Sequence, residues 1–208
     1  MDNAAVGFAG EGFGLRSAAL DVINSDHWDG FGRRTEHLDD PAWRAAFLAR
    51  WGWADMAAAE PLPRADVARL RARLRRIVDA VAAGQGVGDD DAVALDGWLA
   101  SPARRHLARD TQGYTLEWAP LEAGWSWIMA EIAASMVDML VPHQSRRLKV
   151  CPNPGCRWAF YDETNGNTRR WCNDRACGNR DKVRRFRARR TGVPAAADAD
   201  TVDDITEL

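Results

Sequence analysis

The sequence is poor in lysine and lacks a long uninterrupted hydrophobic run. Lys149 and Lys182 are the only lysines among 208 residues, so arginine fills nearly every basic position and a single arginine marks no site. The most apolar long stretch, residues 125–141, contains Glu131 and Asp138 and is too short to span a bilayer. It predicts a buried helix, and we expect no membrane partner.

The first twenty residues also lack the basic segment and apolar core of a secretory signal. The composition, 46% apolar and 28% charged, is ordinary for a globular protein. Together these features predict a cytoplasmic protein.

Cysteine is absent from the first 150 residues, and all four cysteines lie in one short window. They are Cys151, Cys156, Cys172 and Cys177, two C-x4-C pairs separated by fifteen residues. Zinc is held by four such donors at tetrahedral corners. A disulfide framework is disfavoured by the expected reducing compartment, and a nucleophilic cysteine by histidines that all lie upstream. We predict a structural Zn²⁺ site that leaves no position for a catalytic water, so we expect no enzyme.

The residues around the cysteines predict a small zinc finger. Two prolines and a glycine between the first pair suit a tight turn. We expect a hairpin with strands at 157–162 and 168–172, followed by a helix over 179–190. This order of knuckle, hairpin and helix is the layout of a treble-clef finger.

The finger is also the most basic part of the chain. Residues 146–190 carry 14 Lys and Arg against 4 Asp and Glu, whereas the remainder carries 14 against 26. Such an asymmetry predicts a surface for a polyanion, with DNA as the first partner and RNA as the second. If 179–190 is helical, Val183 and Phe186 share one side and are expected to pack on the hairpin. The candidate nucleic-acid-binding residues are Arg169, Arg170, Arg180, Lys182, Arg184, Arg185, Arg187 and Arg189.

An alternative interpretation makes the finger a protein-interaction module. Charge alone specifies no partner, so the basic surface could bind an acidic protein or the acidic surface of its own chain. Residues 191–208 contain five acidic and no basic residues, and we expect them to form a disordered tail that could fold back on the finger.

The upstream region predicts a mostly helical domain. A short apolar element at 17–26 is followed by a loop at 27–38. Apolar spacing and capping residues then predict helices, which we place at 41–53, 64–83, 89–99 and 125–139. Residues 104–120 predict a β-hairpin. The fold class is therefore α+β, and the expected parts are a helical domain (1–145), a four-cysteine treble-clef-like finger (146–190) and the tail (191–208).

Ten tryptophans are many for this length. They either anchor the core or line a pocket for a small-molecule effector. The candidate pocket residues are Trp28, Trp43, Trp51, Trp53, Trp125 and Trp127. A homodimer is a further expectation, because one finger makes a small DNA footprint.

Several motifs resemble known families. The run Cys177-Gly178-Asn179-Arg180 with Lys182, the stretch WAFYDET (158–164) and the stretch RRWC (169–172) are similar to the CGNR-type zinc finger of bacteria. The upstream region is similar to the ABATE domain. ALDVINS (19–25) stands where that family shows a leucine-aspartate-aromatic-valine-asparagine motif, with Val22 and Ile23 in place of the aromatic residue and valine. The resemblance implies a stress-linked transcription regulator whose finger binds DNA. We expect the upstream domain to sense a ligand or to mediate dimerisation.

Overall fold

The computed structural model describes residues 17–58, 60–111, 113–141 and 144–191. The predicted disordered tail, 191–208, lies outside the described residues except for its first residue. Of the helices in the described segments, none has both the length and the apolarity that crossing a membrane requires.

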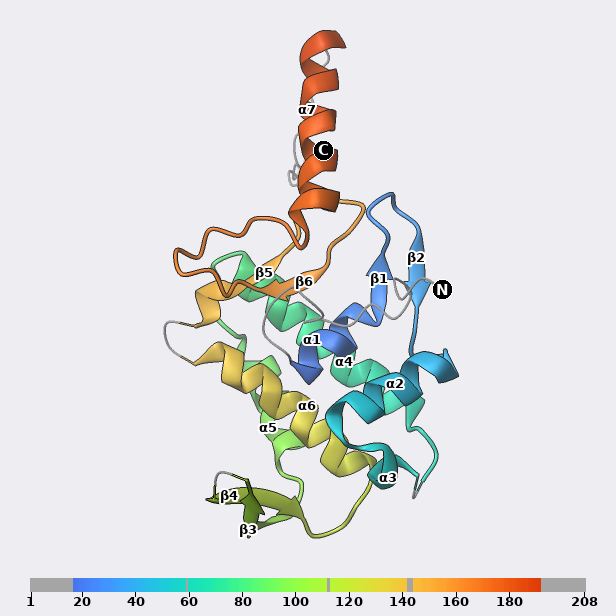
Figure 1. Cartoon of the computed structure of the whole chain (residues 1–208), viewed down its shortest axis with the longest axis vertical. Helices are drawn as coiled ribbons and strands as arrows, with labels where there is room; N and C mark the ends of the chain where they lie inside the picture. The colour runs from blue at the N-terminus through green and yellow to red at the C-terminus, as the bar shows by residue number, and fades with distance from the viewer. Residues whose placement is uncertain (1–16, 59, 112, 142–143, 192–208) are drawn as a thin grey trace, which may run out of the picture.

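Three helices form the centre of the molecule (Figure 1): α1 (Ala18–Asn24), α4 (Arg64–Ala82) and α6 (Trp125–Leu140). Every residue of α1 is buried, so this short helix is surrounded by the others. The apolar face of α4 consists of Val67, Leu70, Leu74, Ile77 and Val78, each at most 2% exposed. The three- and four-residue spacing predicted this face, and the structure confirms it.

The remaining helices of this part are α2 (Pro41–Trp51), α3 (Ala54–Ala57) and α5 (Asp89–Leu99). The start of α2 follows its predicted cap, since Oδ1 of Asp40 accepts a hydrogen bond from the Ala42 N–H at 2.9 Å.

Two antiparallel hairpins belong to the same part. The hairpin of β3 (Ala103–Asp110) and β4 (Gly113–Pro120) confirms the prediction, and it lies at the end of the molecule opposite the C-terminal helix (Figure 1). The hairpin of β1 (Asp26–Trp28) and β2 (Arg34–Glu36) occupies the segment that was predicted to be a loop. Its strands are only three residues long, and the turn between them contains Gly30 and Gly32 at positive φ.

The C-terminal part is built on a third small hairpin. A 3₁₀ turn (Ser145–Arg147) leads into β5 (Leu148–Val150), which pairs with β6 (Ala159–Tyr161). A π-helical turn (Asp174–Gly178) then leads into the C-terminal helix α7 (Asn179–Thr191).

The predicted pairing of 157–162 with 168–172 is wrong. Strand β6 pairs with β5 instead, and 168–172 contains no strand. The reason is the fully buried Asp162, whose carboxylate accepts hydrogen bonds from Lys149 Nζ at 2.6 Å, Thr164 N at 3.0 Å and Arg169 N at 2.8 Å. Burial raises the pKa of Asp162, but the hydrogen bonds from Lys149 and Thr164 outweigh it and lower the pKa to about 2. The charged Asp162 side chain therefore fixes residues 164–169 by hydrogen bonds, and these residues need no strand pairing.

The predicted packing of Val183 and Phe186 is also wrong. The two side chains are 40% and 55% exposed, and α7 projects beyond the body of the molecule (Figure 1). The finger has a small apolar cluster of its own, formed by Phe160, Trp171 and three of the cysteines, and this cluster does not include α7.

The third hairpin shares the core of the helices. Leu148, Ala159 and Tyr161 are buried in one cluster with residues of α1, α4 and α6. The helical part and the finger are therefore packed together through the β5–β6 hairpin. The domain boundary near residue 145 stays a prediction.

Candidate metal centre and nucleic-acid interface

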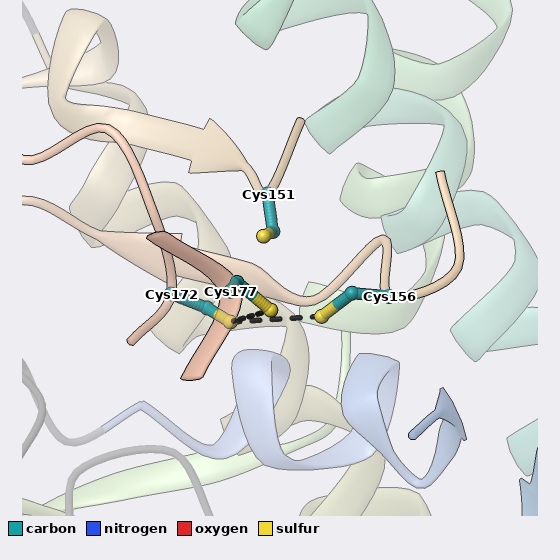
Figure 2. A group of neighbouring side chains, drawn as sticks. All are labelled: Cys151, Cys156, Cys172 and Cys177. Atoms are coloured by element: carbon teal, nitrogen blue, oxygen red, sulfur yellow. Dashed lines mark hydrogen bonds between the residues drawn. The ribbon is translucent and has the colours of Figure 1, made fainter. Parts of the chain in front are cut away.

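The four cysteines converge from two structural units. Cys151 follows β5 and Cys156 lies in the turn before β6. Cys172 precedes the π-helical turn, and Cys177 lies within it. Figure 2 shows their sulfurs pointing toward one another. All four Sγ atoms lie within 4.8 Å of one another, with 3.6 Å between Cys156 and Cys172 and 3.7 Å between Cys172 and Cys177.

These distances fit a tetrahedral zinc ion. With Zn–S bonds of about 2.3 Å, the sulfurs of a four-thiolate site lie about 3.8 Å apart. Cys151, Cys156 and Cys177 are at most 5% exposed, which keeps solvent from the centre. A zinc ion held here by the four cysteines would offset two of the four thiolate charges and would join the knuckle to the π-helical turn. Four protein ligands fill the tetrahedron, as in structural sites.

The thiols alone resist ionising together. Hydrogen bonds from Cys156 and Cys172 lower the pKa of Cys151 to about 2. The hydrogen bond to Cys151 raises the pKa of Cys156 to about 12, and hydrogen bonds to Cys151 and Cys156 raise the pKa of Cys172 strongly. One thiolate therefore forms readily, and its negative charge opposes ionisation of the neighbouring thiols. A cation is required to keep all four cysteines as thiolates.

Neighbouring amides shape the two knuckles. Oδ1 of Asn153 accepts a hydrogen bond from Gly155 N at 3.2 Å, and its Nδ2 donates to Cys177 Sγ at 3.5 Å. Asn173 caps the π-helical turn by accepting from Ala176 N at 3.0 Å. The Asn153 donor fixes the orientation of the Cys177 thiolate and stabilises its charge.

A family model described as "Putative stress-induced transcription regulator", ABATE, matches residues 16–142, more than half of the chain. The chain belongs to the ABATE family. A second model, the CGNR zinc finger, matches residues 147–190. No curated protein matches the sequence. The two descriptions name a regulator and a zinc finger rather than an enzyme, and with the cysteine geometry they identify structural zinc as the cofactor.

Two polar residues of α1, Asp21 and Asn24, have a structural role that the sequence did not reveal. Nδ2 of Asn24 donates to Ala159 O at 2.8 Å, and Oδ1 of Asn24 accepts from Ala159 N at 2.9 Å. Asn24 thereby pairs with the backbone of β6 as a strand would. Oδ2 of Asp21 accepts from Trp51 Nε1 at 2.9 Å and lies 3.3 Å from Arg50 Nε. The signal for this role in the sequence was the presence of two polar residues, three positions apart, in an otherwise apolar helix.

The β1–β2 turn of the ABATE domain docks on the first zinc knuckle. Gly30 N donates to Gly155 O at 2.7 Å, and Asn153 Nδ2 donates to Gly30 O at 3.2 Å. Beside this contact, the Arg180 guanidinium lies 4.0 Å from the centre of the Phe31 ring. Sequence reasoning missed this turn, although an aromatic residue between two glycines marked it.

The predicted nucleic-acid-binding residues fall into two groups. In the first, the cations are engaged with other side chains and backbone carbonyls of the protein. Arg169 lies over the Phe160 ring at 4.6 Å and donates to the carbonyls of Trp171 and Cys172, while Arg180 is half-buried against Phe31. Arg169 therefore supports the finger, and Arg180 joins the finger to the β1–β2 turn.

In the second group the cations are exposed. Arg170 lies at the surface with its guanidinium 5.2 Å from the Trp171 ring. The others are on α7, where Arg184 and Arg185 each pair with the nearly buried Asp181 at 2.8 Å. The exposed cations of α7 are Lys182, Arg184, Arg185, Arg187, Arg189 and Arg190.

An open groove separates the β1–β2 turn from α7. It has a volume of about 480 Å³ and is lined by Gly30, Phe31, Asn153, Asn179, Arg180, Asp181, Val183, Arg184 and Arg187. Apolar and cationic side chains thus share one surface at the junction of the ABATE domain and the finger.

Several of the six candidate tryptophans are core residues, and the effector pocket stays a prediction. Trp43, Trp53 and Trp125 are buried in the main core, where Trp43 stacks on Phe47 at 5.2 Å. Trp127 is 7% exposed, and Trp51 donates to Asp21. The groove beside α7 is lined by none of the six candidate tryptophans, Trp28 included.

Proposed function

We propose that this ABATE-family chain is a transcription regulator that binds duplex DNA through α7. The observation that carries the proposal is the projecting helix, which displays six exposed cations while its one acid, Asp181, is 6% exposed and already paired (Figure 1). A row of like charges repels itself unless anions neutralise it, and the phosphates of DNA supply such anions at regular spacing.

The dimensions of α7 support a duplex as the partner. Its thirteen residues span about 20 Å at the usual helical rise. An α-helix fits the major groove of B-DNA, and a helix that stands clear of the body can enter it without a clash. Zinc at the base of α7 gives this helix a fixed starting point.

Fluorescence anisotropy of a labelled random-sequence duplex with the zinc-loaded full chain, measured across a salt series, tests the proposal. Six phosphate contacts give a slope of log affinity against log salt of about −5. Replacing Arg187 and Arg189 by alanine should make the slope shallower by about 2. The matched control replaces Arg69 and Arg76 on α4, whose side chains are 72% and 53% exposed, and should leave the slope unchanged. Absence of binding at low salt would contradict the proposal.

The proposal assigns dimerisation to the β3–β4 hairpin, with a second copy of the chain as the partner. Leu107, Tyr114, Leu116 and Trp118 are 61–69% exposed and share one face of this two-stranded sheet. Such a hairpin is marginal in water by itself. Its arginines suit a second copy, because the chain outside residues 146–190 has 26 acidic against 14 basic residues. Sedimentation equilibrium should show a dimer that Leu116→Asp converts to monomer, and a monomeric wild type at high concentration would refute this assignment.

A protein-interaction role is the second candidate. It is favoured by one observation, the five acidic residues of 191–208 that follow α7 directly in the sequence. If they compete for the cations of α7, removing 191–208 raises DNA affinity, whereas equal affinity rejects the competition. Both candidates place the protein in the cytoplasm, where thiols stay reduced.

A further inference from the structure

The groove between the β1–β2 turn and α7 combines features that α7 alone does not offer. Phe31 is 78% exposed and Val183 is 40% exposed, so the groove presents apolar surface to solvent. Arg184 and Arg187 lie on its α7 side. A ligand that is flat and apolar at one end and anionic at the other matches this pattern, and a nucleotide unit has that chemistry.

The aromatic wall of the groove is preorganised. Oδ1 of Asp29 accepts hydrogen bonds from Phe31 N at 2.7 Å and Arg33 N at 3.2 Å, which fixes the turn that carries the ring. Arg180 stacks on the same ring at 4.0 Å and also points a donor at Cys177 Sγ at 3.9 Å. An exposed ring backed by a guanidinium is a surface on which nucleobases stack.

We infer that this groove is a nucleobase site, which takes one base unstacked from the DNA strand whose phosphates lie on α7. Phe31 contacts the face of the base, and Asn179, which is exposed at the groove, offers an amide donor and acceptor to its edge. Arg184 and Arg187 receive the adjoining phosphates. The inference rests on the proposed function, since it names the part of the bound DNA that the groove contacts. It also gives the ABATE domain a direct role in binding, through Phe31.

Two labelled duplexes of the same sequence, one with a single-base bulge, test the inference by anisotropy with the zinc-loaded full chain. Base stacking on an aromatic residue is strong enough that the wild type should bind the bulged duplex about tenfold more tightly. Phe31→Ala should lose this preference while keeping the affinity for the intact duplex and its salt slope. Phe31→Trp should restore the preference. Val93→Ala, which truncates a residue that is 73% exposed on α5, is the matched control and should behave as the wild type.

The outcomes separate the inference from the proposed function. Equal binding of both duplexes by the wild type, with a steep salt dependence, overturns the nucleobase site and leaves the proposed function standing. A preference that survives in Phe31→Ala also overturns the site. Binding of neither duplex overturns both. Adenosine monophosphate distinguishes a free nucleotide from a strand: if it binds in a Phe31-dependent way and the bulge gives no preference, the groove serves a free nucleotide and the strand assignment is wrong.

Discussion

Replacement of Asn24 by alanine should lower the free energy of unfolding strongly. The side chain is 1% exposed, and its amide makes both of its hydrogen bonds to Ala159 of β6. Ala159 is itself fully buried. In Asn24→Ala the backbone N–H and C=O of Ala159 therefore lose their partners in a place that water does not reach.

The magnitude follows from the two unpaired groups. A buried donor or acceptor without a partner costs about 1–3 kcal/mol, so Asn24→Ala should lower the free energy of unfolding by about 2–6 kcal/mol. This is a large share of the roughly 5–15 kcal/mol that stabilises an ordinary domain. Asn24→Asp should not rescue the loss, because the carboxylate keeps an acceptor for Ala159 N but faces Ala159 O with a negative charge.

Urea unfolding of the zinc-loaded chain, followed by circular dichroism and tryptophan fluorescence, measures the effect. Asn165→Ala is the matched control, because Asn165 is exposed and truncating it should change stability by less than about 0.5 kcal/mol. If Asn24→Ala is as stable as Asn165→Ala, the paired hydrogen bonds do not join α1 to β6 in the way the structure indicates.

Two further predictions concern zinc and pH. Cys172→Ser should abolish stoichiometric zinc binding, measured by elemental analysis, and with it DNA binding. Most of the far-UV circular dichroism signal should remain, because α1, α4 and α6 keep their core. Full retention of zinc would contradict the four-cysteine site. Burial lowers the pKa of His27 and His37, and the neighbouring His37 lowers that of His27 further. The folded state therefore binds fewer protons than the unfolded state, so stability should be constant above about pH 6.5 and fall below it, and a flat urea midpoint between pH 7.5 and 5.5 would contradict this.

The sequence was sufficient for features that depend on spacing along the chain. The apolar period of α4 and the cap at Asp40 are local signals, and the structure shows both. The two cysteine pairs were equally informative, because four soft ligands in 27 residues have few other uses.

Features that depend on contacts across the chain were not predictable in this way. The Asn-Gly turn at 165–166 is typical of a hairpin, but Asp162 and Lys149 satisfy the backbone of the returning segment and remove the need for a strand. The spacing of Val183 and Phe186 placed them on one side of a helix without showing whether anything covers that side. Phe31 and Arg180 are far apart in sequence, so their contact had no sequence signal.

The docking of the β1–β2 turn on the zinc knuckle makes the direction of α7 depend on the ABATE domain. Asp181 in the first turn of α7 is 6% exposed, and the tip of this thirteen-residue helix lies about 20 Å from its start. A tilt of about 10° at the base would therefore move the tip by about 3 Å, enough to break phosphate contacts.

Gly155→Ala tests this dependence. A methyl group on Gly155 would lie 3.0–3.1 Å from backbone atoms of Gly30 and Gly32, which cannot move aside as a side chain can. The turn and the knuckle must therefore move apart by a few tenths of an ångström, although every cation of α7 is retained. We expect affinity for a selected DNA site to fall while the salt slope for random DNA stays unchanged, as anisotropy with the two DNAs will show. Gly97→Ala in α5, where an added methyl meets open space, is the control and should alter neither. Unchanged affinity of Gly155→Ala for the selected site would mean that zinc alone sets the direction of α7.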